Sequence, residues 1–323
     1  MGTAGDVVEF RSFRAGDGPG IADCWTLAAP GDGITYERFR DLILLDRNFD
    51  ANGLIVATRS EQIVGVVYAV RRLVAAEGDN LERESGWIPF FFVHPGERRS
   101  GLGTQLVQRA KGWLRVHGCR QVFFSSYTPN YFLPGLDAQR YPGALALLTN
   151  LGFETEYESV AMDRSLNDYH MPQANRDKIT ALRAKGYYLG SPSGDDLVDL
   201  IDIAGNHFNP DWGRAIREAV LNGLSRGQIL VARSPEGSML GWAMHGAYES
   251  VLERFGPFGV LTQSRGTGLG EALLHLTLER MRALGGHSAW FLWTDEGSPA
   301  GHLYAKTGFS VTRTFAIMKA QLS

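Results

Sequence analysis

The sequence predicts an α/β protein made of two domains of similar design. The chain has 323 residues, which is long for a single hydrophobic core. A glycine-rich stretch occurs twice, as RRSGLG at 98–103 and as RGTGLG at 265–270. Each copy follows an apolar, strand-like run and leads into residues with helical spacing, so the chain carries an internal repeat.

The first half shows the following order of elements. Apolar runs predict strands at GLIVATRS, QIVGVVYAVRRLV and WIPFFFVHP, ahead of the glycine-rich corner. One face of a helix after the corner is marked by Leu106, Ala110, Trp113, Leu114 and Val116. CRQVFFSSY then predicts a buried strand, and ALALLTNLGFETEYESVAMDRSL predicts a helix, a glycine stop and a last strand.

The second half repeats this order. QILVARSPEGSMLGWAMHGAY predicts a hairpin, RFGPFGVLTQ the strand before the corner, and EALLHLTLERMRALGG the helix after it. SAWFLWTD predicts the next strand, and GHLYAKTGFSVTRTFAIMKAQL a helix, a glycine and a strand. The sequence LGF at 151–153 therefore corresponds to TGF at 307–309.

A polar segment separates the two halves. NDYHMPQANRDK at 167–178 contains a proline and lies between two periodic regions, which is typical of a linker. We therefore expect domains at 1–168 and 169–323. Residues 15–50 and 194–223 are the expected helical openings of the two domains, and the first copy carries an inserted, ordered loop around 127–143.

The composition excludes several classes of partner. The net charge is −3 and the pI about 6.3, so there is no basic excess for general binding to nucleic acid or to anionic membranes. The two cysteines, Cys24 and Cys119, lie far apart and form no metal-binding pair, as in a reducing compartment. The N-terminus lacks an apolar signal core, and no apolar run is long enough for a bilayer. We expect a cytoplasmic protein without a metal site.

The repeated corner has the physical features of an anion site. The N-terminus of a helix presents unpaired N–H groups with a partial positive charge, and glycines let a bulky anion approach the backbone. Neither copy has the Gly-Lys-Ser/Thr of a Walker loop. A Rossmann loop is also disfavoured, because Glu271 occupies its third small position in the second copy and Ser100 its first glycine in the first.

A third pattern fits both copies. Arg/Gln-x-x-Gly-x-Gly/Ala is met by Arg98, Gly101 and Gly103, and again by Arg265, Gly268 and Gly270. Followed each time by a strand, a helix and a -GF- strand, it resembles the acyl-CoA diphosphate loop of the GNAT N-acetyltransferase superfamily. EGSPAGHLYAKTGF resembles the final signature of that family. The resemblance covers nearly the whole chain, as a tandem pair of domains. The alternative interpretation of the repeated motif is that its glycines only allow a tight turn between strand and helix.

The resemblance implies a fold and a co-substrate. Each domain would be a mixed, twisted sheet flanked by helices, with a splayed gap beside the strand before the corner. The pantetheine arm of acetyl-CoA lies in that gap, and main-chain N–H groups of the strand, near Phe91 in the first copy, polarise the thioester carbonyl. The implied binding residues are Phe258, Val260, Arg265, Gly266, Thr267, Gly268, Leu269 and Gly270, and in the first copy Val93, Arg98, Arg99, Ser100, Gly101, Leu102 and Gly103.

The resemblance also separates the two halves by their chemistry. In the family, the leaving thiolate often takes its proton from a tyrosine four residues before the glycine of -GF-. Tyr304 stands there in the second half and Leu148 in the first. We therefore predict a catalytic C-terminal domain with Tyr304 as general acid, and an N-terminal domain without that acid. Tyr141 stays open as another donor, and an ordinary helix position is the alternative for Tyr304.

The general base is less defined. An alkylamine has a pKa of about 10.4, so a base or a path of water molecules must take its proton before it attacks. The candidates are His245 and Glu249, with Glu253, Asp295 and Glu296 nearby; a solvated or structural role is the alternative for each. Aromatic residues that would line an acceptor pocket or belong to the core are Phe208, Trp212, Trp290 and Trp293.

These observations predict an acetyl-CoA-dependent N-acetyltransferase. It would transfer an acetyl group to the primary amine of a small molecule by direct attack on the thioester. Two alternatives remain: a non-catalytic acyl-CoA-binding or regulatory protein, and a protein-lysine acetyltransferase. No nucleic-acid or membrane partner is expected, and pairing of sheet edges into a homodimer stays open.

Overall fold

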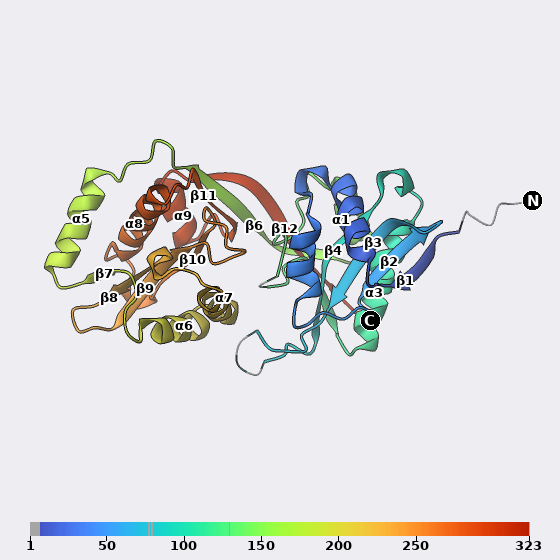
Figure 1. The fold of residues 1–323 in the computed structure, drawn as a ribbon, viewed down its shortest axis with the longest axis horizontal. Coiled ribbons are helices and arrows are strands. Elements are labelled where there is room, and N and C mark those ends of the chain that lie inside the picture. The colour runs from blue at the N-terminus through green and yellow to red at the C-terminus, as the bar shows by residue number, and fades with distance from the viewer. Residues whose placement is uncertain (1–6, 77, 79, 129, 323) are drawn as a thin grey trace, which may run out of the picture. The chain divides into compact units, whose positions relative to one another are not determined.

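The computed structural model describes residues 7–322 apart from 77, 79 and 129 (Figure 1). By its contacts the chain divides into two units. Unit 1 comprises Met1–Ala75, Asp79–Ser159 and Thr314–Ser323, and unit 2 comprises Ala76–Gly78 and Val160–Arg313.

Unit 1 is a mixed sheet covered by helices on both faces. Its strands are β1 (Glu9–Ser12), β2 (Leu54–Arg59), β3 (Gln62–Val70), β4 (Ser85–Val93) and β5 (Gln121–Phe124). Its helices are α1 (Asp17–Ala28), α2 (Tyr36–Phe39), α3 (Leu102–Val116) and α4 (Pro142–Asn150), with the short turns η1 (Pro30–Asp32), η2 (Arg40–Leu44) and η3 (Pro95–Glu97). β1 to β4 pair in antiparallel order, and β4 and β5 run parallel.

The alternation of side chains along β3 explains why both faces of this sheet are covered. Val66, Tyr68 and Val70 pack into the core beneath α1 and α2, whereas Val67 and Ala69 pack into the core beneath α3 and α4. Successive residues of a strand point to opposite faces, so a continuous apolar strand requires a layer on each side.

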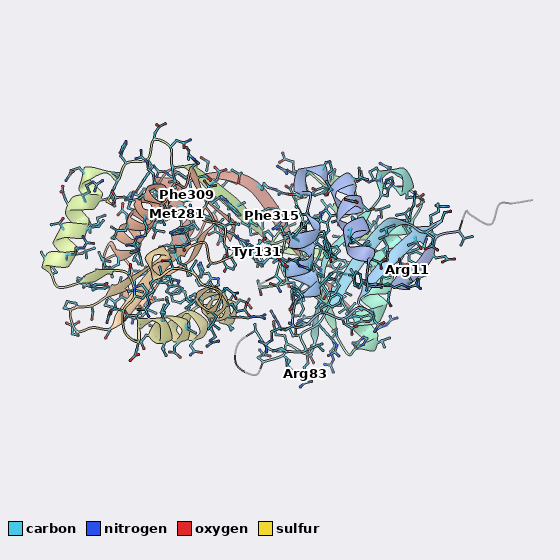
Figure 2. The ribbon with its side chains drawn as sticks, in the orientation of Figure 1. Arg11, Arg83, Tyr131, Met281, Phe309 and Phe315 are labelled. Carbon is cyan, nitrogen blue, oxygen red and sulfur yellow. The ribbon has the colours of Figure 1, made fainter. Side chains whose placement is uncertain are left out.

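Unit 2 has the same layers in a second copy. Its strands are β7 (Tyr188–Gly190), β8 (Ile229–Arg233), β9 (Met239–His245), β10 (Phe255–Val260) and β11 (Ser288–Thr294). Its helices are α5 (Gln173–Ala184), α6 (Asp196–His207), α7 (Pro210–Leu221), α8 (Leu269–Ala283) and α9 (Pro299–Lys306), with η4 (Arg226–Gln228) and η5 (Thr262–Ser264). β10, β9, β8 and β7 form an antiparallel sheet in that order. Met281 and Phe309 belong to its core on the α8 side (Figure 2).

The last strand of each half is exchanged. β6 (Glu154–Ser165) ends the first half, yet its residues Val160–Ser165 pair with β11. β12 (Ser310–Gln321) ends the second half, yet its residues Met318–Gln321 pair with β5. β6 and β12 are themselves neighbours in the sheet (Figure 1). The sequence predicted both strands, but the exchange gives contact units that differ from the single boundary at 168/169.

The structure also bears on the predicted helical opening of the second half and on the predicted linker. α6 and α7 lie within the predicted helical opening at 194–223. The expected linker at 167–178 is only partly irregular, because α5 begins at Gln173. Ile179 and Leu182 of this helix are buried in the core of unit 2, and burial of this apolar face outweighs its polar composition. Among the described residues, no helix is long and apolar enough to cross a membrane.

Substitution of Gly135 tests the contact between the inserted loop and β12. A Cβ at this position would lie 2.4 Å from the carbonyl oxygen of Ala316. The next residue, Leu136, exchanges two main-chain hydrogen bonds with Ala316. We expect Gly135→Ala to lower the free energy of unfolding by about 1–3 kcal/mol, because backbone atoms must separate. Gly143→Ala in α4 is the matched control: nothing lies within 4 Å of its Cβ. Equal denaturation midpoints for the two variants would contradict this packing.

Candidate active site

The two glycine-rich corners have the same backbone conformation. The second residue of each is left-handed, with φ of 64° at Arg99 and 78° at Gly266, and so is the fourth, with φ of 80° at Gly101 and 87° at Gly268. A left-handed conformation costs an ordinary side chain about 1–2 kcal/mol, so the first copy tolerates strain at Arg99 that glycine avoids in the second.

Side-chain hydroxyls fasten both corners in the same way. Ser100 donates to the carbonyl of Glu97 at 2.7 Å, and Thr267 donates to the carbonyl of Ser264 at 2.6 Å. These bonds close the turn between each strand and its helix. Leu102 and Leu269, the first residues of α3 and α8, are buried and anchor the helices.

The helix N-termini at the corners begin at glycines, and the one side-chain bond to a first-turn amide among the described residues is the long one from Leu269 to the Thr267 hydroxyl, at 3.4 Å. No side chain accepts a hydrogen bond at the N-caps, Gly101 and Gly268. The amides of the first turns therefore keep the partial positive charge of a helix start. The arginines of the motif do not add to this charge equally: Arg98 donates to the carbonyl of Ala28 at the end of α1, at 2.6 Å, and Arg265 is exposed. Each corner can therefore hold an anion through its main chain.

The contacts of the last glycine in each corner show which residues of α4 and α9 are equivalent. A Cβ on Gly103 would meet Leu147 of α4 at 2.9 Å, and one on Gly270 would meet Leu303 of α9 at 3.6 Å. Leu147 and Leu303 therefore stand in the same place in the two units. It follows that Leu148 and Tyr304, the next residues along each helix, are equivalent in space as well as in sequence.

In unit 2, one edge of β10 lies open beside the corner. Leu261 donates to the carbonyl of Leu240 at 2.8 Å, and Gly259 is paired opposite Trp242, so these main-chain groups face β9. Hydrogen bonding alternates along an antiparallel strand, so the main-chain groups of Phe258 and Val260 point to the other side. Beyond the single bridge from Arg254 to Trp290, β10 and β11 belong to different sheets.

Unit 1 has the equivalent open edge on β4. The His94 amide donates to the carbonyl of Val64 at 2.8 Å, which directs the main chain of Phe91 and Val93 away from β3 by the same alternation. The parallel register with β5 ends at the pair Ile88 and Phe124. In both units, pairing with the next strand therefore ends before the corner, which is compatible with the splayed gap that the resemblance implies.

Tyr304 lies among aromatic side chains of unit 2. It is 6% exposed, and its ring centroid lies 4.5 Å from that of Phe291 and 5.6 Å from that of Phe309. The rings of Phe255 and Phe258 on β10 lie at 6.0 Å each. Burial raises the pKa of the phenol, so it keeps its proton at neutral pH. A protonated phenol thus packs against the strand that leads to the second corner.

His245 ends β9 with one ring nitrogen bound and one unused. Nδ1 lies 3.0 Å from the carbonyl of Leu252, which can only accept, so Nδ1 carries the hydrogen in the neutral ring. Nε2 is buried and has no hydrogen-bond partner. Burial lowers the pKa of this imidazole, which keeps it neutral with a free lone pair. His245 is opposite Phe255 in the strand register, and so on the same face of the sheet.

The acidic candidates have structural partners. Glu249 accepts from Arg254 at 2.7 Å, and the guanidinium of that buried arginine lies 4.6 Å from the ring of Tyr248. The carboxylate of Glu253 accepts the amides of His287 and Ser288 at the start of β11; the His287 bond is the main cause that lowers the pKa of Glu253.

Farther along the chain, Asp295 accepts the amide of Gly297 and closes a turn. In the inserted loop of unit 1, Asp137 accepts the amide of Arg140 at 2.9 Å and so orders the loop.

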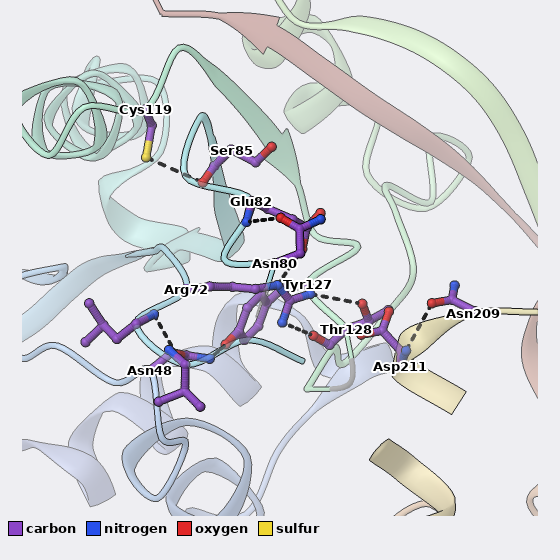
Figure 3. A network of polar contacts seen from close by, with 12 residues as sticks. Asn48, Arg72, Asn80, Glu82, Ser85, Cys119, Tyr127, Thr128, Asn209 and Asp211 are labelled. Carbon is purple, nitrogen blue, oxygen red and sulfur yellow. Dashed lines mark hydrogen bonds and ion pairs between the residues drawn. The ribbon is translucent and has the colours of Figure 1, made fainter. Parts of the chain in front are cut away.

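A polar network in unit 1 was not singled out by the sequence (Figure 3). Arg72 is buried, bonds to Glu82 at 2.6 Å and to the carbonyl of Thr128 at 3.1 Å, and lies 5.4 Å from the ring of Tyr127. The Asn48 amide donates to the Tyr127 hydroxyl at 2.8 Å. The sequence gives one weak signal for this network: Arg72 follows closely after an apolar strand. Exposed arginines also occupy such positions, so the signal does not identify a buried one. The network ties the segment after β5 to the loop between β3 and β4.

Aromatic residues of the predicted acceptor wall in unit 2 pack together. Phe208 and Trp212 are half-buried and stacked at 5.8 Å, and both meet Trp242 edge to face, at 4.9 and 6.0 Å. A Cβ on Gly259 would lie 2.6 Å from the Trp242 ring. This cluster therefore supports β10 from the face opposite to Tyr304.

Known proteins share this fold. A model of the acetyltransferase (GNAT) family matches residues 22–132, which include the first corner. Mycothiol acetyltransferase of Propionibacterium freudenreichii subsp. shermanii is 25% identical over 243 residues, 69% of this chain and 67% of its own. A tandem GNAT protein from the clavulanic acid biosynthesis pathway has a TM-score of 0.68 at 16% identity and covers 98% of this chain and 99% of its own.

Two further structures agree with this architecture. A GCN5-related N-acetyltransferase from Sphaerobacter thermophilus has a TM-score of 0.69 at 18% identity, covering 98% of this chain and 96% of its own. The GCN5-related glucosamine N-acetyltransferase region of a fungal multi-domain β-N-acetylglucosaminidase has a TM-score of 0.79 at 18% identity; the match covers 97% of this chain and only 38% of the fungal one.

The fold and the paired corners define an α/β acyltransferase. Residues 22–132 match the acetyltransferase (GNAT) family model, and the fold of the whole chain is similar to that of a tandem GNAT protein. The resemblance noted from the sequence is thereby confirmed, and the family uses acetyl-CoA as its acyl donor.

Two glycines of the second corner should respond differently to substitution. Gly268→Ala places a side chain at φ 87°, and we expect it to lower the free energy of unfolding by about 1–2 kcal/mol. Gly270→Ala is the control, because it is helical and its Cβ would find only ordinary contacts from 3.5 Å outward. Urea denaturation followed by circular dichroism measures both. A loss at Gly270 as large as that at Gly268 would contradict the left-handed corner.

Proposed function

We propose that the protein is an acetyl-CoA-dependent N-acetyltransferase that acts on the primary amine of a small molecule, with unit 2 as the catalytic unit. One observation carries this proposal: a buried, protonated Tyr304 packs against β10, whose open edge leads directly to an uncapped glycine corner. Unit 1 has the same corner and edge but leucine in place of the phenol.

In this proposal each part of unit 2 has one task. Acetyl-CoA supplies the acyl thioester. The first-turn amides of α8, with Gly266 and Gly268, bind its diphosphate. Main-chain N–H groups of Phe258 and Val260 face the gap and stabilise the negative charge that develops on the carbonyl oxygen. Three residues of strand lie between these groups and the bridge at Arg254, and in this proposal they limit how far the thioester reaches.

The chemical step then balances as follows. The neutral amine attacks the thioester carbonyl, a C–N bond forms, and the C–S bond breaks. The amine loses one proton to a base, and the departing sulfur takes one proton from the Tyr304 hydroxyl. The proton on the base then returns through solvent to the Tyr304 phenolate, so both groups regain their starting state. A free thiol of cysteine type has a pKa of about 8.5, so a thiolate that leaves at neutral pH readily accepts a proton once released.

His245 is the stronger candidate for the base. Its neutral ring offers a free lone pair at Nε2, whereas the Glu249 carboxylate is held at 2.7 Å by a buried arginine, which stabilises its charge and weakens it as a base. His245 shares a sheet face with Phe255, which contacts the Tyr304 ring.

Unit 1 has a different proposed role. Leu148 cannot supply a proton, and the Tyr141 hydroxyl donates to Asp32 at 2.5 Å. With its corner intact, unit 1 would bind acetyl-CoA without turnover and stabilise the fold. This is the non-catalytic alternative applied to one half of the chain.

The acceptor is proposed from chemistry and from relatives together. The names of two relatives refer to mycothiol and to glucosamine, which are small molecules. The half-buried rings of Phe208 and Trp212 offer a wall for an apolar or ring-shaped part of such an acceptor. A panel of small amines that includes amino sugars, assayed by release of free thiol from acetyl-CoA, tests the activity; binding of CoA without turnover of any amine would contradict it.

Tyr304→Phe separates proton donation from packing. The variant keeps the ring among its aromatic neighbours, so we expect an unchanged unfolding midpoint and unchanged CoA affinity. The turnover number should fall by about 10²–10⁴, because the thiolate then leaves without its acid. Tyr141→Phe is the matched control and should keep full turnover. A Tyr304→Phe enzyme of normal kcat would remove the phenol from the mechanism.

The pH dependence of kcat/KM tests His245. Its pKa is lowered below the ordinary 6.5, so the imidazole is neutral and active above that value. We expect kcat/KM to be level near pH 7 and to fall only as the pH drops below about 6.5 and protonates Nε2. His245→Gln should reduce the rate and abolish this acid limb, with Glu249→Gln as comparison. An acid limb that persists unchanged in His245→Gln would assign the base to another residue.

A further inference from the structure

A charged cluster beside the second corner has no part in the mechanism above. Lys178 extends from α5 and forms a hydrogen-bonded ion pair with Glu271 in the first turn of α8. Lys306 of α9 reaches the other oxygen of the same carboxylate at 3.2 Å. Glu271 is therefore held between two ammonium groups that come from two different helices.

Lys178 also covers the corner itself. A Cβ on Gly268 would lie 3.0 Å from its Cδ, so the aliphatic part of the side chain crosses the glycine at which α8 begins. The side chain is 39% exposed. Rotation of its terminal torsions is therefore sufficient to move the ammonium from Glu271 to an anion bound at the helix start.

The first corner has no such arrangement. Thr104 stands where the second copy has Glu271, and nothing lies within 4 Å of a Cβ on Gly101. The two corners have the same backbone conformation, but only the second has this cluster of charged side chains. The difference follows from α5, which precedes the strands of unit 2 and packs beside α8.

The state of Glu271 indicates what the cluster can do. Burial acts to raise its pKa, but hydrogen bonds from Lys178, Asn175 and Lys306 together lower it to about 2. The group is a carboxylate at any physiological pH, at a place where the helix amides also favour negative charge. A diphosphate carries more charge and more acceptor oxygens than one carboxylate, so it can compete for Lys178 while Lys306 keeps Glu271 neutralised.

We propose that Lys178 is a ligand of the diphosphate of the acyl-CoA donor in unit 2, and that Glu271 holds its ammonium beside the corner until the donor binds. This inference rests on the proposed function of the corner. The Lys178 ammonium then donates to a diphosphate oxygen that also receives the first-turn amides of α8. Unit 1, without this lysine, binds the donor through its main chain alone.

Hydrogen exchange of the full chain resolves the two corners separately. Protection of a peptide over 262–272 is followed against the concentration of CoA, and a peptide over 95–105 reports the first corner in the same sample. For Lys178→Met we expect the midpoint at 262–272 to rise about tenfold, with CoA and with dephospho-CoA alike, since one charge-assisted hydrogen bond is lost. The midpoint at 95–105 should not change. Lys185→Met, at the exposed end of the same helix, is the control and should shift neither peptide.

The other outcomes overturn the inference in distinct ways. An unchanged or lower midpoint in Lys178→Met would show that the lysine is a bystander or an obstruction. A shift with CoA but not with dephospho-CoA would assign it to the 3′-phosphate instead. In each of these cases the wild-type protein still protects 262–272, and the proposed function stands. Absence of protection at 262–272 in the wild type would overturn both together.

Discussion

Backbone pairing that stops partway along one strand is the constraint on which the site depends. β4 pairs with β5 only as far as Ile88, and β10 meets β11 only at the bridge from Arg254. Past those points each strand is bonded on one side alone. An exposed strand edge normally invites another chain, but here the edge is short and ends at a helix start. An extended ligand with amide groups can complete the pairing, and its anionic end then meets the helix amides.

The duplication allows the two copies to be compared within one molecule. Both keep the left-handed corner, the hydroxyl bond that closes it and the open edge, although the first must hold Arg99 in a conformation better suited to glycine. The copies differ at the position of the proton donor and at the ion-pair cluster around Glu271. In the proposed mechanism, the shared features would bind the donor, whereas the features that differ would affect protonation and charge. This pattern fits one catalytic unit beside one that retains binding.

The exchange of β6 and β12 makes the two halves interdependent. Each strand has a continuous buried run in its second part, from Ser159 to Met162 and from Phe315 to Met318. Such runs must be covered on both faces. Without β12 from the second half, the edge of β5 would be unpaired, and without β6 from the first half, the edge of β11 would be unpaired. The two halves are therefore expected to be stable as one chain rather than as two separate domains.

The sequence by itself determined the local elements and their order. The glycine corners, the amphipathic helices after them and the equivalence of Tyr304 with Leu148 could all be read from spacing, because they depend on contacts between residues close in the chain. Only the tertiary structure decided which strand pairs with which, that α5 is a helix, that Arg254 neutralises Glu249, and that Lys178 crosses Gly268. These depend on packing between segments far apart in sequence. Such contacts leave no periodic pattern, so the linker at 167–178 was predicted as irregular although its end is helical.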